Sequence, residues 1–267
     1  MKRRDFIKTS ITASALAGVA PASLPASAAE SGNMTNRDYY ELRAYRLKAG
    51  ASHDLLDDYL AKAAIPALNR IGVKNVGVFT EPEAKDGPAV WVLIPYGSLE
   101  MFSTAAARVN ADSDYQKTGE KYLQVPKDQA AFDRIDSWLL LAFSGMPRLE
   151  VPVLARDKKT RIFEMRTYES YSEVKALKKV EMFNSGEIDV MHEVNLSPVF
   201  YGQALIGRDL PHLTYMLCGE NKDEHKKHFS DFGKHPTWNK LKNDPQYAET
   251  VSKITSRFLE PTAYSQI

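Results

Sequence analysis

The chain has 267 residues, a net charge of +1 at neutral pH, 43% hydrophobic residues and 26% charged residues. This nearly balanced charge argues against a nucleic-acid partner, which would require a basic surface. The single cysteine, Cys218, excludes an intramolecular disulfide, so the fold must be stabilised by its core.

The first 29 residues are arranged like an export signal. Arg3 and Arg4 come first, a weakly apolar run covers residues 11–20, and Ala26–Ala28 is a small-residue cleavage site. This layout is typical of a bacterial twin-arginine signal. The apolar run is shorter than the ~20 residues of a spanning helix. We therefore expect a periplasmic or secreted protein, cleaved near Ala28, whose mature part has no stable membrane span. An uncleaved signal that acts as an anchor is the alternative.

A six-residue pattern then occurs twice. Residues 40–45 have the order aromatic, Glu, aliphatic, Arg, small and Tyr, and residues 163–168 repeat it 123 positions later. Duplication of this kind indicates two copies of one structural unit. We expect a first repeat over 38–144, a linker over 145–160 with two prolines, and a second repeat over 161–267.

The first repeat begins with the patterned segment, which alternates as a strand does. In chain order its segments are predicted to be strand 39–47, helix 53–71, strand 74–80, loop 81–89, strand 90–94, helices 98–109, 113–123 and 127–135, and strand 137–143.

The second repeat follows the same plan. It is predicted to contain strand 161–168, helix 172–194, strands 198–206 and 212–217, helix 223–232, a helical stretch that opens at 236, helix 245–254 and strand 258–264.

The order β-α-β-β-α-β is that of a ferredoxin-like unit, with helices on one face of an antiparallel sheet. The second face of each sheet has to be covered. We therefore predict an α+β protein whose two sheets pack face to face and form one barrel within the chain. A homo-oligomer remains compatible with this arrangement.

The first strand of each repeat has an apolar face and a polar face, because successive side chains point to opposite sides. If the apolar face packs on the helices, the polar faces point into the barrel. Two Glu-Arg-Tyr triads would then share a cavity. The arginines could bind a carboxylate or phosphate, and the tyrosines could donate to an oxyanion. In the alternative interpretation, each Glu pairs with the neighbouring Arg and holds the two sheets together.

Several short motifs resemble the NIPSNAP family of the dimeric α+β barrel superfamily. They are the Glu-Leu/Met-Arg-x-Tyr openings, the segment His212–Tyr215 after a glycine-containing turn, and His235–Trp238. The resemblance covers residues 38–265 and implies tandem repeats of that fold. Related barrels include haem-dependent enzymes and cofactor-free monooxygenases, but a fold does not determine a function. The first copy departs from the pattern, since Ala89 stands where the second copy has His212.

The histidines allow a second kind of chemistry. His192 and His212 could act as axial ligands if haem were bound, although a hydrogen-bonded structural role is the more common one, and no cofactor is predicted. His225 and His228 lie among lysines on a predicted helix, which indicates a solvated face and no metal site. The candidate ligand-binding residues are therefore Glu41, Arg43, Tyr45, Glu164, Arg166, Tyr168, His192 and His212.

Three functions remain open at this point. The favoured one is binding of a small organic molecule inside the barrel, which the arginines would allow to be anionic. The second is an oxidoreductase that works without a cofactor or with haem, so whether the protein is an enzyme is not decided. The third is a protein-interaction module with a filled barrel.

Overall fold

The computed structural model describes residues 37–48 and 52–267. The predicted export signal over residues 1–29 lies outside these ranges. Within the described ranges, no helix is long and apolar enough to span a membrane.

The first repeat has the predicted order of elements. They are β1 (Tyr39–Arg46), α1 (Asp54–Tyr59), η2 (Leu60–Ala64), α2 (Ile65–Arg70), β2 (Gly77–Thr80), β3 (Ala89–Tyr96), α3 (Leu99–Asn110), α4 (Ser113–Leu123), η3 (Lys127–Gln129) and β4 (Arg134–Ala142).

The second repeat is built in the same way after the short helix α5 (Val153–Arg156) in the linker. Its elements are β5 (Ile162–Glu169), α6 (Glu173–Met182), η4 (Phe183–Glu187), α7 (Ile188–Glu193), β6 (Pro198–Ile206), β7 (His212–Gly219), α8 (Lys222–Lys234), α9 (Pro236–Lys242), η5 (Pro245–Tyr247) and β8 (Lys253–Pro261).

The last part of each repeat differs from the prediction. The helices expected over 127–135 and 245–254 are three-residue 3₁₀ turns, and the strands that follow begin at Arg134 and Lys253, earlier than predicted. The reason is tertiary. β4 and β8 each pair along much of their length with the first strand of their repeat, β1 and β5, and this ladder outweighs the local helical pattern.

Side-chain caps explain where several helices begin. Ser98, Asp112, Ser172 and Asn221 each have extended backbone angles and accept a hydrogen bond from a backbone N–H of the first helical turn. Such caps satisfy donors that a helix cannot pair internally. The first helix of each repeat is interrupted at the same place, by the π turn η2 in the first repeat and in the second by η4, where Gly186 has a non-helical φ of 131° and kinks the helix. The two interruptions are again 123 residues apart.

The strands of the two repeats form one closed barrel in the order β1-β3-β2-β8-β5-β7-β6-β4. Each repeat contributes a ferredoxin-like sheet with its first strand in the middle. The two sheets meet where β2 pairs with β8 and where β4 pairs with β6. The predicted α+β fold with an intramolecular barrel is therefore confirmed.

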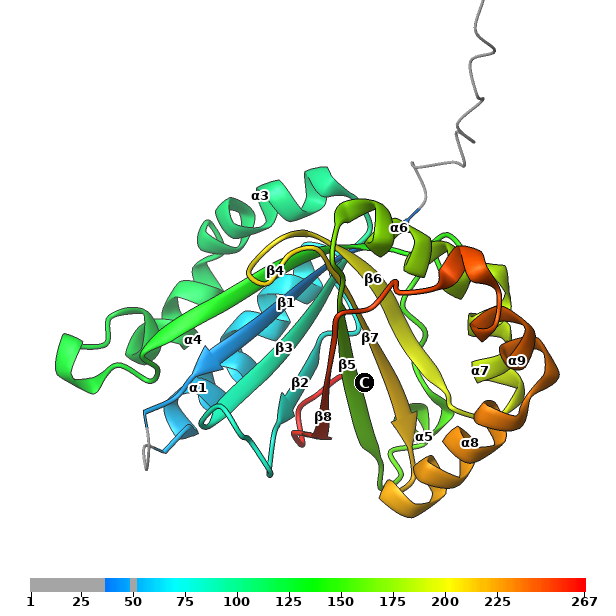
Figure 1. Cartoon of the computed structure of the whole chain (residues 1–267). Helices are drawn as coiled ribbons and strands as arrows, with labels where there is room; N and C mark the ends of the chain where they lie inside the picture. Colours follow the sequence, from blue (N-terminus) through cyan, green and yellow to red (C-terminus); the bar gives the residue numbers. More distant parts are fainter. Residues whose placement is uncertain (1–36, 49–51) are drawn as a thin grey trace, which may run out of the picture. The chain divides into compact units, whose positions relative to one another are not determined.

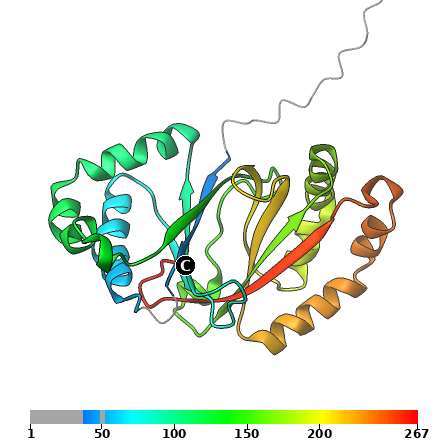
Figure 2. The same ribbon diagram turned by 60° about the vertical axis from the view of Figure 1, so that its left-hand side comes forward.

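Helices cover the outside of this barrel. Figure 1 shows α1, α3 and α4 on the side of the first repeat and α6 to α9 on the side of the second, and Figure 2 shows the strands between these two layers. One apolar cluster fills much of the barrel interior, and its members include Tyr40, Leu42, Phe163, Met165 and Phe200. Two further clusters lie between the sheets and their own helices.

Candidate functional site

The two Glu-Arg-Tyr triads point toward the helices, so the predicted direction is wrong. Tyr45 and Tyr168 belong to the two sheet–helix clusters, whereas Tyr40, Leu42 and Met165 lie inside the barrel. The physical reason is that eight strands project their inner side chains into one narrow space. The more apolar face of each strand fills that space with less desolvation of charge.

In the first repeat, the triad is a saturated hydrogen-bonding group. Arg43 donates to both carboxylate oxygens of Glu41, from Nε at 2.6 Å and from Nη2 at 2.8 Å. Tyr96 and Ser137 also donate hydroxyl hydrogen bonds to Glu41. The alternative interpretation, in which neighbours pair with each other, describes this group better, but the pair lies between sheet and helices.

The second triad contacts His225, which was predicted to lie on a solvated helix face. Glu164 accepts from Arg166 Nη1 at 2.6 Å and contacts His225 Nε2 at 2.9 Å, and His225 is only 2% exposed. Burial alone would raise the pKa of Glu164, but His225, Arg166 and Ser256 outweigh it and lower that pKa. His225 shares a helix face with Phe229 and Phe232, four and seven positions on, a spacing that could have indicated its burial.

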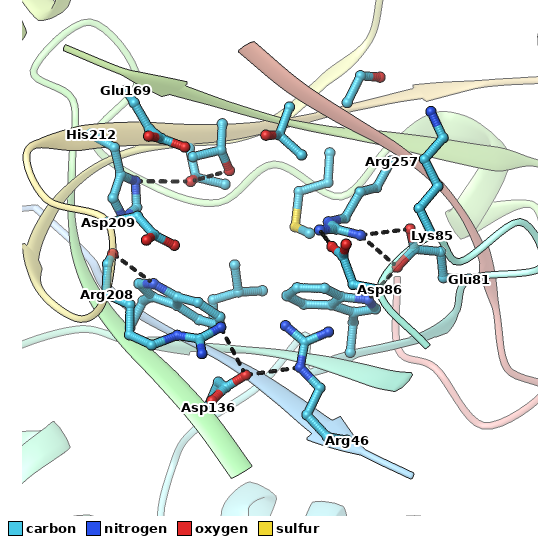
Figure 3. A pocket seen from close by; sticks show the side chains of 18 of the residues that line it. Arg46, Glu81, Lys85, Asp86, Asp136, Glu169, Arg208, Asp209, His212 and Arg257 are labelled. Carbon is cyan, nitrogen blue, oxygen red and sulfur yellow. Dashed lines mark hydrogen bonds and ion pairs between the residues drawn. The ribbon is translucent and has the colours of Figure 1, made fainter. Parts of the chain in front are cut away.

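The barrel is open at one end. A cavity of about 1000 Å³ lies where β1 and β5 end and where β3, β4, β7 and β8 begin. We call it the barrel-mouth cavity. Its lining includes inward-facing residues of both repeats, among them Trp91, Trp138, Thr167 and Thr214. Figure 3 shows its charged residues arranged around the opening, with Arg46, Asp136 and Arg208 on one side and Arg257, Glu81 and Asp86 on another.

The first repeat supplies an aromatic wall. The rings of Trp91 and Trp138 are stacked with centroids 6.0 Å apart and planes inclined by 22°. They come from β3 and β4, on either side of β1, and Ala44 of β1 leaves room for them. Arg46 and Arg257 lie over Trp91, at 5.3 and 5.4 Å from its ring centroid. This distance allows cation–π attraction.

The charges around the mouth are unevenly paired. Asp136 is shared by Arg46 Nε at 2.8 Å and Arg208 Nη2 at 3.2 Å, so two guanidinium groups have one carboxylate. Arg46 Nη1 is buried and has no hydrogen-bond partner. Arg257, in contrast, pairs with both Glu81 and Asp86. Among these paired groups, Arg46 therefore keeps one buried donor without an acceptor.

The second repeat supplies a hydroxyl wall. Thr167 lies opposite Thr214 and Thr255 on the neighbouring strands, and the hydroxyl oxygens of Thr167 and Thr214 are 2.9 Å apart. His212 Nδ1 lies 3.4 Å from the Thr214 hydroxyl, and its Nε2 is buried without a partner. Burial lowers the pKa of His212, so the ring is neutral at neutral pH.

The structure separates the predicted site residues into different places. His212 lines the barrel-mouth cavity, while His192 is exposed and lines neither this cavity nor the one between the sheet and the helices of the second repeat. An axial haem ligand needs a ring nitrogen at a cavity, so only His212 of the two candidates is suitably placed. Arg166 and Tyr168 line a second cavity between sheet and helices. In the described residues, no group of three His, Cys, Asp or Glu side chains is arranged to hold a metal ion.

Sequence reasoning missed most of the barrel-mouth residues. Arg46 shares its strand face with Ala44, and this alternation could have identified it once the direction of the face was known. Trp91 is buried as an apolar strand residue is expected to be, and its place at the cavity wall follows only from the structure. Arg257 lies on β8, whose beginning was predicted too late, so its side of the sheet could not be assigned.

Solved structures with a similar fold cover most of the chain. A protein from Lactobacillus acidophilus NCFM, described as a "putative monooxygenase", matches with a TM-score of 0.57 and 9% identity over 84% of this chain and 94% of its own. A protein from Fusobacterium nucleatum with the same description matches with a TM-score of 0.54 and 9% identity over 85% and 93%. At this identity the likeness concerns the fold alone.

Smaller relatives match part of the chain. An uncharacterised NIPSNAP-like domain protein from Burkholderia xenovorans is 18% identical, covers 39% of this chain and 88% of its own, and has a TM-score of 0.35. No curated protein sequence matches significantly. The NIPSNAP family model matches residues 40–143 and 163–266, which together are more than half of the chain. The chain therefore belongs to the NIPSNAP family and carries two copies of its characteristic repeat.

Proposed function

We propose that the protein binds a small, planar organic anion in the barrel-mouth cavity. The observation that carries this proposal is Arg46, whose Nη1 is buried and unpartnered beside a cavity of about 1000 Å³. A buried donor without an acceptor costs free energy. A ligand carboxylate or phosphate that accepts from this guanidinium would remove that cost.

The two walls of the cavity account for the rest of the ligand. The stacked rings of Trp91 and Trp138 offer an apolar surface for a planar group. Opposite them, the hydroxyls of Thr167 and Thr214 can donate to or accept from polar substituents. A cavity with mostly fixed walls and a few convergent polar groups is the usual form of a small-molecule site. The presence of the barrel-mouth cavity also argues against an interaction module whose barrel is completely filled.

Tryptophan fluorescence provides the test. The probe is 2-naphthoate, with neutral 2-naphthalenemethanol as its uncharged analogue. We expect quenching that saturates with 2-naphthoate and is weaker with the alcohol. Arg46→Met is expected to weaken 2-naphthoate binding by about tenfold or more, which corresponds to one charged hydrogen bond.

Arg43→Met is the matched control, because Arg43 lies on the same strand but faces the helices. It is expected to leave the affinity for 2-naphthoate unchanged in protein that circular dichroism shows to be folded. Equal losses in both variants, or equal binding of acid and alcohol, would remove Arg46 as the anion-binding group.

Turnover and export are tested separately. The "putative monooxygenase" description of two similar folds motivates measurement of oxygen uptake with each ligand that binds. Uptake that disappears in Arg46→Met would add an oxidation to the binding function.

Export to the periplasm rests on residues 2–28, and we expect the double variant Arg3→Lys/Arg4→Lys to remain in the cytoplasmic fraction.

A further inference from the structure

A second cavity lies between the sheet and the helices of the second repeat. It has a volume of about 380 Å³, and we call it the sheet–helix cavity. Phe229, Phe232 and Trp238 give it a largely apolar lining, and its polar groups come from Arg166, Tyr168, Tyr215, Lys179 and Glu187. It lies on the outer face of β5 and β7, so it is distinct from the barrel-mouth cavity.

The cavity contains a buried ion pair. Lys179 Nζ lies 2.8 Å from Glu187 Oε2, and the two side chains are 5% and 2% exposed. Three rings surround the ammonium group, with centroids 4.6 Å away for Phe183, 5.4 Å for Trp238 and 5.7 Å for Tyr168. Glu187 directly follows Gly186, whose non-helical φ of 131° produces a kink between α6 and α7.

The duplication provides an internal comparison for this pair. The segments η2 and η4 are 123 residues apart, as are the two strand motifs, so Lys179 corresponds to Leu56 and Glu187 to Ala64. Both first-repeat residues are buried in an apolar cluster. The fold is therefore compatible with apolar side chains at these positions. A buried ion pair is a poor source of stability compared with such side chains, so its presence in one repeat calls for another role.

The charges of this layer restrict the ligand. Arg166 and Lys179 are cationic and pair with Glu164 and Glu187. A ligand that arrives with a net charge would leave one charge uncompensated in a buried place, which is costly. A neutral ligand that gives up a proton avoids this cost, because the new negative charge replaces the one that is neutralised.

We propose that the sheet–helix cavity is a second ligand site, which takes a small apolar molecule with one weakly acidic O–H group, a phenol or an enol, whose proton Glu187 accepts. The O–H bond of the ligand breaks, the proton goes to the Glu187 carboxylate, and the oxyanion remains beside Lys179 and Arg166. Arg166 Nε donates to Tyr168 Oη at 3.3 Å, and the hydroxyl oxygens of Tyr168 and Tyr215 are 2.9 Å apart. Both hydroxyls lie at the same cavity; one of them donates to the other, and the second hydroxyl can donate to the oxyanion. Burial raises the pKa of Glu187, which agrees with a group that takes up a proton.

The test uses 4-nitrophenol, whose phenolate has its own absorption band. Added to the full chain at a pH below the probe's own pKa, it is expected to develop the phenolate band in proportion to the protein. In weak buffer this change releases no proton to the solution, because Glu187 holds it. The double variant Lys179→Leu/Glu187→Ala gives the second repeat the residues that the first repeat has at these positions. It should bind the probe about tenfold or more weakly.

A matched control lies on the same helix. Lys178 and Glu181 form an exposed ion pair at 2.7 Å, so Lys178→Leu/Glu181→Ala removes one lysine and one glutamate without touching the cavity. It is expected to behave as the unchanged protein does. Glu187→Gln cannot take the proton, so any phenolate band in that variant must be accompanied by proton release.

Four results would overturn the proposal. They are no binding of 4-nitrophenol, equal binding by Lys179→Leu/Glu187→Ala, binding of the probe only as the neutral phenol, and a signal that disappears in Arg46→Met but not in the Lys179/Glu187 double variant. The last result would place the phenol in the barrel-mouth cavity, which leaves the proposed anion site intact. Failure of 2-naphthoate binding, in turn, has no effect on the phenolate signal.

Discussion

Replacing Lys179 with leucine removes one partner of a buried ion pair and leaves the Glu187 carboxylate alone. Because Glu187 is only 2% exposed, bulk water compensates little of this charge. Breaking a buried pair from one side typically costs about 3–5 kcal/mol. For a protein of this size, such a loss lowers Tm by on the order of 10 °C.

The double variant Lys179→Leu/Glu187→Ala should behave very differently. It removes both charges together, and such replacements are often neutral or stabilising by about 1–4 kcal/mol. The smaller alanine leaves some unfilled space, which offsets part of this gain. We therefore expect the free energy of unfolding of the double variant to be at most about 1 kcal/mol below that of the unchanged protein, or above it. The double variant should therefore exceed the single variant by about 2 kcal/mol or more, although it carries one more substitution.

Urea unfolding followed by circular dichroism measures these differences, and their pH dependence provides a second check. Burial raises the pKa of Glu187 in the folded state above its ordinary value of 4.5. The Lys179 ammonium group partly counteracts this rise, so removal of Lys179 raises the pKa of Glu187 further. A carboxyl with a raised pKa contributes stability below its unfolded pKa and loses it as the pH rises through the folded pKa. The free energy of unfolding of Lys179→Leu should therefore approach that of the unchanged protein as the pH is lowered toward 4.5. Additive losses in the double variant, or a deficit independent of pH, would refute the reasoning.

Three further predictions concern other parts of the molecule. The lowered pKa of Glu164 means that its ionised form stabilises the fold above pH 4.5, and this stability is lost as the pH falls through the folded pKa, so Glu164→Gln should show a flatter loss of stability in acid urea titrations. Burial raises the pKa of Cys218 to about 12, so iodoacetamide should leave the native protein unlabelled at mildly alkaline pH and label it fully in denaturant. Gly207 has φ of 146°, and a Cβ there would overlap the Trp138 ring, so Gly207→Ala should change the near-ultraviolet circular dichroism and weaken 2-naphthoate binding.

Each of these has a contrary outcome. A steeper acid loss in Glu164→Gln would mean that the carboxylate is not stabilising. Rapid labelling of native Cys218 would indicate that its surroundings open easily. An unchanged spectrum for Gly207→Ala would mean that the turn moves away from Trp138 at little cost.

The order and type of the main strands and helices could be predicted from the sequence alone, because they depend on local patterns of residues. The repeated strand motif and the alternation of strands and helices were sufficient to predict two β-α-β-β-α-β units and their union in one barrel. Helix starts were close to the prediction where a cap such as Ser98 or Asn221 is present. The strands β4 and β8 were predicted to begin too late, because their pairing partners are distant in sequence.

Only the tertiary structure decided which face of each strand points inward. Alternation defines two faces, but the choice between them depends on what all eight strands place inside the barrel. That choice turned the triads of Arg43 and Arg166 toward the helices and brought Arg46 and Arg257 to the mouth. The site residues come from strands far apart in the sequence, and their proximity results from barrel closure. For the same reason, the ion pair of Lys179 and Glu187 became visible as a candidate site only through the packing of the second repeat.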